Sequence, residues 1–279
     1  MRLTRQSTFE NEGYRARYGA PRPPAVAALP LPPAAMPAWR GARPLKRWRY
    51  VAAFSESLML CAAEVRIGPA RQAFWAVWDR EGRALHGRTL RRAGAVALPP
   101  GALRVGEARI DLELDEEDGV ETVCPSGRQY AWTRKQGGLA ARGSVCGRAF
   151  EGRAIVDDSA GYHARHTAWW WSAGVGEAAD GTPVAWNLVE GMNDPPRNSE
   201  RTVWVAGEPV EPPPVTFAPD LSSVGELRFT EEARRERGEN LLLVRSRYVQ
   251  PFGTFAGVLP DGTELRAGLG VMERHVVAW

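Results

Sequence analysis

The chain has 279 residues, of which 44% are hydrophobic and 25% are charged, and its formal net charge is +3. This composition is typical of a globular protein, and its length permits one domain or two. Because the positive charge is small and scattered, it excludes the strongly basic surface that a nucleic-acid partner requires.

The cysteines and the N-terminal segment indicate the compartment. Cys61, Cys124 and Cys146 lack the paired spacing of a zinc site and are too few for a disulfide scaffold. The segment after Met1 is polar, unlike a signal peptide, and prolines interrupt the later apolar run "AVAALPLPPAAMPAW". We therefore expect a cytoplasmic protein with no stable membrane insertion. The sequence leaves its oligomeric state unknown.

Residues 1–45 carry much of the proline and arginine, as in "APRPPAVAALPLPPAAMPAWRGARPLKR". Proline fixes φ and lacks a backbone donor, so this composition predicts an extended arm lying across the surface of the domain. Its PxxP matches leave a second interpretation open, in which the arm is a ligand for an SH3-like domain.

Strands are predicted from Trp48 onward, because aromatic and β-branched runs alternate with turn residues: "RWRYVAAF", "SLMLCAAEVRI" and "QAFWAVWD". Ile110, Leu112 and Leu114 alternate with polar residues, which is the period of a half-buried strand. The following "DEEDG" predicts a hairpin into "VETVC", and "DREG", "ADG" and "PDG" predict further tight turns.

Few segments have the features of a helix. Residues 229–240, "FTEEARRERGEN", have Thr230 as a candidate cap and two glutamates in the first turn, which indicates a short helix. A change in composition near residue 150 predicts two β domains, 46–150 and 151–279. The many short strands favour an all-β fold of two packed antiparallel barrels or sandwiches.

The C-terminal domain contains the unusual block "HTAWWWSAGVG" at residues 166–176. In a strand, Trp169 and Trp171 face one side and Trp170 faces the other, so one face contacts something other than the shared core. The glycines of "GVGEAADG" lie between two predicted strands. They therefore predict a hairpin turn, because a dinucleotide fingerprint must open a helix.

Several long blocks resemble domain of unknown function 2804 across residues 40–279: "LMLCAAEVRIGPARQAFWAVWD", "RHTAWWWSAGVGEAADGTPVAWNLVEGMND", "SERTVWVAG", "LLLVRSRYVQPFGTFAGVLPDG" and "GLGVMERHVVAW". That family implies no activity. More distantly, the chain is similar to the lipocalin-like hydroxyneurosporene synthase group, which includes carotenoid hydratases. This resemblance implies two lipocalin-like (calycin-type) β-barrel domains and an isoprenoid or lipid-like ligand, but no catalytic residue.

Polar residues within apolar strands supply the candidate site for a small hydrophobic ligand. Glu273 or His166 is the expected proton donor to an alkene or enol, with His163 as a further catalytic candidate. Trp170 is the expected aromatic wall, which would stabilise a developing cation, and Asn193 is expected to orient the ligand. The remaining candidates for ligand binding are Glu190, Arg245, Tyr248 and His275.

Two other kinds of site remain open. His163, His166, His275 and Glu273 have ligand types that suit zinc or iron, but they form no compact motif, so neither a metal nor a cofactor is expected. A non-catalytic carbohydrate-binding module would use exposed tryptophans as a stacking platform. Enclosure separates the alternatives, because a closed apolar pocket favours a lipid-like ligand and an open aromatic platform favours a sugar.

Overall fold

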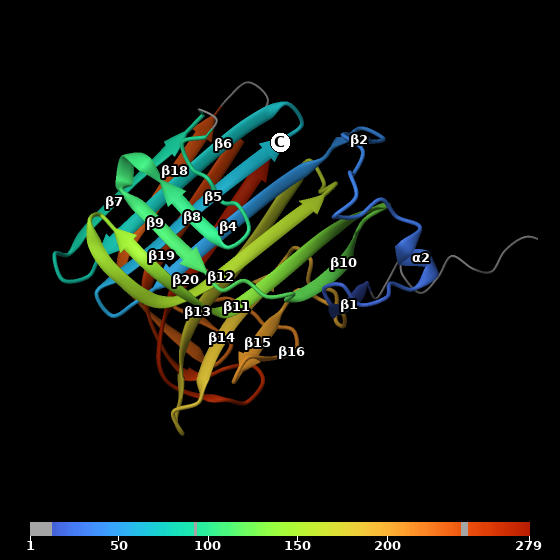
Figure 1. The fold of residues 1–279 in the computed structure, drawn as a ribbon. Coiled ribbons are helices and arrows are strands. Elements are labelled where there is room, and N and C mark those ends of the chain that lie inside the picture. The colour runs from blue at the N-terminus through green and yellow to red at the C-terminus, as the bar shows by residue number, and fades with distance from the viewer. Residues whose placement is uncertain (1–12, 92–93, 241–244) are drawn as a thin grey trace, which may run out of the picture.

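The computed structural model describes residues 13–91, 94–240 and 245–279, and almost all of its regular structure is β. Two large antiparallel sheets make up the molecule, with the blue-to-green strands of the first in front of the orange and red strands of the second (Figure 1). The predicted all-β class of two packed antiparallel units is confirmed. The first twelve residues of the predicted arm, and residues 241–244 of the block "LLLVRSRYVQPFGTF", lie outside the described residues.

The first sheet has ten strands, eight of them in the order β1-β10-β11-β12-β4-β5-β6-β7, while β9 pairs with both β8 and β11. Its strands are β1 (Tyr14–Arg17), β4 (Lys46–Phe54), β5 (Leu58–Ile67), β6 (Ala70–Asp79), β7 (Ala84–Leu90), β8 (Ala102–Val105), β9 (Ile110–Leu114), β10 (Val120–Ser126), β11 (Gln129–Val145) and β12 (Arg148–Gly161).

The second sheet has eight strands in the order β16-β15-β14-β13-β20-β19-β18-β17. Its strands are β13 (His166–Ala178), β14 (Pro183–Glu190), β15 (Thr202–Val205), β16 (Glu208–Val210), β17 (Ser223–Val224), β18 (Leu227–Asn240), β19 (Arg245–Val258) and β20 (Glu264–Ala278). The remaining elements are a two-stranded ribbon of β2 (Trp39–Arg40) and β3 (Arg43–Pro44), the short helix α2 (Pro24–Ala27) and the 3-10 turn η1 (Gly106–Ala108).

The chain passes from the first sheet to the second between Gly161 and His166. The division expected at residue 150 falls inside β12, which pairs with β11 on one side and with β4 on the other. The described part of the N-terminal arm, 13–45, lies on the first sheet. There β1 pairs with β10, and Val26, Leu31 and Met36 are buried against a cluster of aromatic side chains.

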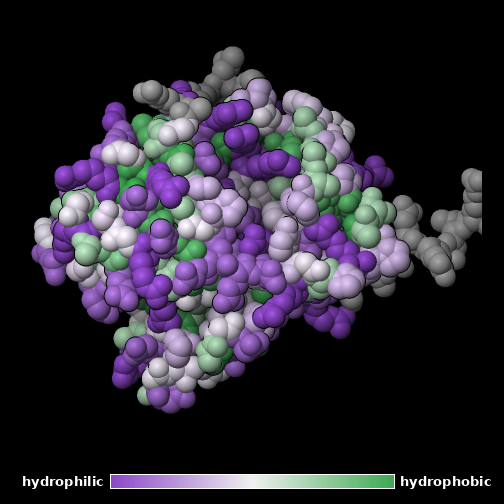
Figure 2. Space-filling model, in the orientation of Figure 1, coloured by the Kyte–Doolittle hydropathy of each residue, from purple (hydrophilic) through white to green (hydrophobic). Residues whose placement is uncertain are grey.

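The alternation of strand side chains creates three apolar layers. One lies between the two sheets, a second lies between the outer face of the first sheet and β8–β9, and a third covers the outer face of the second sheet. The face of the molecule shown in Figure 2 is mainly hydrophilic, with hydrophobic residues in small separate groups. In the described ranges, no helix is long and apolar enough to cross a bilayer.

Three predicted turns are confirmed, because "DREG", "ADG" and "PDG" each join two paired strands. The alternation of Ile110, Leu112 and Leu114 is confirmed as well, since all three are buried in β9. The hairpin from β9 into β10 is wrong, because β9 pairs with β8 and β11. The reason is that β11 has 17 residues, so it pairs with β10 along its first half and with β9 along its second.

The helix predicted over 229–240 is also wrong, because this segment belongs to β18 and pairs with β19 from Leu227 to Asn240. Glutamate and arginine favour a helix locally, but pairing with β19 satisfies the backbone donors and acceptors of the segment. Burial alternates from residue 233 to 240, so Arg235, Arg237 and Glu239 share the less exposed face. That face is turned toward the first sheet.

Candidate functional site

A cavity of about 450 Å³ lies between the two sheets. Its volume falls in the range of about 300–1,000 Å³ that small-molecule sites occupy. Four indoles line it: Trp48 from β4, Trp169 and Trp171 from β13, and Trp279 at the C-terminus. The rest of its wall combines aliphatic side chains with a small number of buried polar groups.

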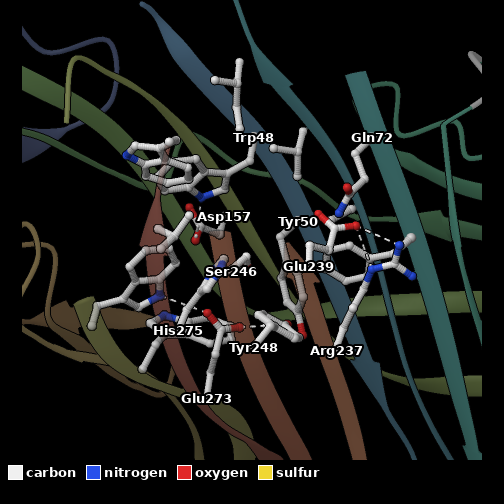
Figure 3. A pocket seen from close by; sticks show the side chains of 18 of the residues that line it. Trp48, Tyr50, Gln72, Asp157, Arg237, Glu239, Ser246, Tyr248, Glu273 and His275 are labelled. Atoms are coloured by element: carbon white, nitrogen blue, oxygen red, sulfur yellow. Dashed lines mark hydrogen bonds and ion pairs between the residues drawn. The ribbon is translucent and has the colours of Figure 1, made fainter. Parts of the chain in front are cut away.

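Strand register brings the polar groups of the second sheet together. Glu273 in β20 is paired with Trp171 in β13, and His275 is paired with both Trp169 and Tyr248. Since residues two apart in a strand share a face, Glu273 and His275 both point into the cavity. Figure 3 shows the two side chains beside Tyr248, with Tyr50 and Asp157 from the first sheet nearby.

Glu273 is a buried carboxyl group of this wall, with 7% of its surface exposed. Its Oε1 accepts a hydrogen bond from the indole of Trp169 at 2.8 Å, and its Oε2 accepts from the Tyr248 hydroxyl at 2.9 Å and from Gln250 Nε2 at 3.1 Å. Burial raises the pKa of Glu273 to about 7, although these donors favour the carboxylate. A carboxyl group with a pKa near 7 is partly protonated at neutral pH.

Gln250 extends this network across to the first sheet. Its Nε2 also donates to the Tyr50 hydroxyl at 3.2 Å, and the thiol of Cys61 donates to its Oε1 at 3.3 Å. Burial raises the pKa of Cys61 to about 11, so the thiol stays protonated at neutral pH. The network therefore fixes Glu273 relative to both walls of the cavity.

His275 is buried among aromatic rings. Its ring centroid lies 4.4 Å from that of Trp169, and its Nε2 is 2.7 Å from the Ser246 hydroxyl. Burial lowers the pKa of His275 to about 3, so the imidazole is neutral near pH 7. A neutral imidazole in this position supplies a hydrogen bond and an aromatic surface rather than a positive charge.

A second buried polar cluster closes the other side of the cavity. Lys135 Nζ lies 2.6 Å from Asp157 Oδ1 and 3.4 Å from Glu200 Oε2, and Asn193 donates to Glu200 at 3.0 Å. Burial raises the pKa of Glu200 to about 7, while the two carboxylates keep the pKa of Lys135 above its ordinary value. Asp157 and Glu200 both line the cavity.

Of the predicted site residues, Glu273, Tyr248 and His275 line this cavity. Trp170 does not, because strand alternation turns it to the outer face of the second sheet. There it contacts the third apolar layer, and the guanidinium of Arg274 lies 5.6 Å from its ring centroid. The prediction that Trp169 and Trp171 share the opposite face is confirmed, and these are the residues that form the aromatic wall.

The other predicted residues lie elsewhere. His163, His166 and Asn193 line a separate, more polar hollow of about 460 Å³. In that hollow His166 is exposed, whereas His163 is buried against Trp48, and burial lowers its pKa to about 3. Glu190 accepts a hydrogen bond from the backbone of Phe217 at 2.8 Å.

The last of the predicted residues, Arg245, is exposed at the start of β19. The four residues considered for a metal site are therefore divided between two hollows. No group of His, Cys, Asp and Glu side chains suited to a metal ion occurs among residues 13–91, 94–240 and 245–279.

The residues predicted from the sequence do not include Tyr50, Asp157 and Arg235, which line the cavity, or Gln250, which joins Glu273 to Tyr50. Asp157 and Gln250 are polar residues within strands that are otherwise rich in apolar residues, and this pattern is the signal in the sequence that could have found them. Tyr50 resembles any core aromatic residue, and Arg235 was assigned to a helix. Their role follows from the approach of strands that are far apart in the sequence.

A family described as "Domain of unknown function (DUF2804)" matches residues 103–279. No curated protein sequence matches the chain. Among solved structures, it is similar to one described as AttH from Nitrosomonas europaea, with 14% identity, a TM-score of 0.40, and coverage of 88% of this chain and 98% of that one. The chain is also similar to kievitone hydratase from Nectria haematococca, with 10% identity, a TM-score of 0.39, and coverage of 84% of this chain and 88% of that one. For CghA the identity is 9% and the TM-score is 0.38, with coverage of 90% of this chain and 95% of that one.

Proposed function

The chain belongs to the domain of unknown function 2804 family, and we propose that this member binds a hydrophobic small molecule in the cavity between its two sheets. We further propose that Glu273 exchanges a proton with that molecule. The observation that carries the proposal is a buried carboxyl group held by Trp169, Tyr248 and Gln250 inside an aromatic cavity.

The burial of Trp169 and Trp171 favours this proposal over a carbohydrate-binding module. The tryptophans of the cavity line an interior space, whereas an open sugar platform would need several exposed rings. Trp39, with 57% of its surface exposed, is the only one of the eleven tryptophans among the large exposed hydrophobic residues of the described ranges. A single exposed ring does not make a platform.

The chemistry that suits Glu273 is acid–base catalysis on an alkene or enol. The carboxyl proton moves to one carbon of the double bond, whose π electron pair forms the new C–H bond, and Glu273 is left as the carboxylate. Indole faces stabilise the resulting cation by about 2 kcal/mol when they are desolvated. Transfer of a neighbouring proton to the Glu273 carboxylate completes an isomerisation, and addition of water with transfer of one of its protons to that carboxylate completes a hydration.

Binding is tested with a neutral fluorescent probe, N-phenyl-1-naphthylamine, and two neighbouring substitutions. Val277 lines the cavity, whereas Val276 is 40% exposed. We expect Val277→Trp to fill the cavity and lower the affinity for the probe at least tenfold, and Val276→Trp to bind as the wild type does. Equal binding by both variants, or no binding by the wild type, would contradict the proposal.

The natural ligand is sought by native mass spectrometry of the purified chain, followed by extraction of any bound molecule. A co-purifying isoprenoid or acyl compound supports the enclosed site and supplies the substrate for acid–base assays of Glu273→Gln. An empty protein that binds a glycan array would instead support the carbohydrate-binding module.

A further inference from the structure

Arg235 projects from β18 toward the first sheet and closes one side of the cavity. Its guanidinium carbon lies 4.1 Å from the ring centroid of Phe74 and 4.9 Å from that of Tyr248. Its Nη2 donates to the hydroxyl of Thr89 in β7 at 3.1 Å. These three contacts hold the guanidinium at a defined position against the wall of the cavity.

The other terminal nitrogen of Arg235, Nη1, is buried and has no hydrogen-bond partner among the described residues. None of the ion pairs in the same ranges includes Arg235, although Glu273 lies two strands away. A buried N–H of a charged group that lacks an acceptor is destabilising, because nothing replaces the hydrogen bond it made to water in the unfolded chain. An acceptor brought by the ligand would remove that cost.

Charge at the outer end of the cavity supports the same conclusion. Arg71, Arg91 and Arg237 line this end, together with a single carboxylate, Glu239. Glu239 is already 2.7 Å from Arg237 and 3.8 Å from Arg91. The excess of guanidinium groups makes the entrance positive, which attracts an anion and raises its local concentration.

From this arrangement we infer that the ligand of the cavity carries a carboxylate, which binds at the guanidinium of Arg235. This inference rests on the proposed function, because it concerns the same cavity. The apolar body of the ligand then lies along the indoles of Trp169 and Trp171. A carboxylate suits the position because a guanidinium presents planar N–H donors to its oxygen atoms.

The strand register also places the carboxylate relative to the proton-exchanging group. Arg235 is paired with Gln250 in β19, and Gln250 contacts Glu273 in β20. Two strand spacings separate the backbones of Arg235 and Glu273, which is about 10 Å. Arg235 and Glu273 therefore lie on the same side of the second sheet, with β19 between them.

The test compares 6-phenylhexanoic acid with 6-phenylhexan-1-ol, which have the same apolar body, by isothermal titration calorimetry at pH 8. We expect the wild type to bind the acid at least tenfold more tightly than the alcohol. Arg235→Gln should lose this preference while still binding the alcohol. The matched control is Arg245→Gln, because Arg245 is exposed on the adjacent strand, and it should keep the preference.

The outcomes separate the two proposals. If the wild type binds both compounds equally, the inference that the ligand carries a carboxylate is wrong, whereas the proposal of a hydrophobic binding site is supported. If Arg235→Gln keeps the preference for the acid, another group recognises the carboxylate and the assignment to Arg235 is wrong. If the wild type binds neither compound, the proposed hydrophobic site fails and the inference fails with it.

Discussion

At the scale of single residues, the candidate site depends on how burial changes the ionisation of a few side chains. Glu273 and His275 lie two residues apart on one face of β20, yet burial affects their charges differently. It raises the pKa of the carboxyl to about 7 and lowers that of the imidazole to about 3. Both shifts favour the neutral form, as an apolar cavity requires.

Glu273→Gln is expected to change how stability depends on pH. The folded chain holds the proton of Glu273 more tightly than the unfolded chain, in which the pKa is about 4.5. The wild type is therefore most stabilised by this group below pH 4.5, and it loses that contribution as the pH rises to about 7. A shift of this size corresponds to about 3 kcal/mol.

Because the amide introduced by Glu273→Gln does not titrate, the stability of the variant relative to the wild type should rise by up to about 3 kcal/mol between pH 4.5 and pH 8. Urea unfolding at the two pH values measures the change. Glu264→Gln, on the exposed end of the same strand, is the control and should keep the pH dependence of the wild type. Parallel pH profiles for Glu273→Gln and the wild type would contradict the assignment.

At the scale of secondary-structure elements, pairing prevails over local preference in β18, and a small residue permits close packing in β11. The register of β11 shifts between Gly137 and Leu139. At this irregularity the indole of Trp204, from β15 of the second sheet, lies directly over Gly137. A side chain at this position would occupy the space of the indole.

We expect Gly137→Ala to lower the free energy of unfolding by about 1–3 kcal/mol, because the new methyl group collides with Trp204. Gly238→Ala is the matched control, since its methyl group would meet no atom within 4 Å and its φ is not in the left-handed region. That substitution should change stability by less than about 0.5 kcal/mol. Urea unfolding measures the free energy of unfolding of both variants. An equal change in the two variants would show that the packing is not tight at Gly137.

At the scale of the whole molecule, buried polar groups join the two sheets across their shared apolar layer. Lys135 belongs to the first sheet, and Glu200 lies in the connection between β14 and β15 of the second. Gln250 and Tyr50 make a second connection of this kind. Because these groups are buried, each depends on its partner to offset the cost of leaving water.

Lys135→Met should remove the cation and leave two buried carboxyl groups facing each other. Losing one partner of a buried ion pair costs about 3–5 kcal/mol, and we expect a loss of this size at pH 8. The loss should be smaller near pH 5, because Glu200, whose pKa is raised to about 7, is then protonated. Glu200→Gln in the same chain should recover part of the stability at pH 8, as measured by urea unfolding. A loss that is the same at both pH values would exclude this explanation.

The sequence by itself determined the all-β class, the family and three of the tight turns. It also determined that Trp169 and Trp171 face away from Trp170. The class, the turns and the facing of the tryptophans depend on local patterns, because a period of two decides which face of a strand a side chain occupies.

Only the tertiary structure decided which strands pair and therefore which side chains meet. It placed Glu273 beside Gln250, Tyr50 and Trp169, and it separated His163 and His166 from that site. It also made a strand of residues 229–240, which put Arg235 on the cavity wall. The physical reason is that pairing partners are selected by burial of whole sheet faces and by contacts between distant segments, which local alternation does not encode.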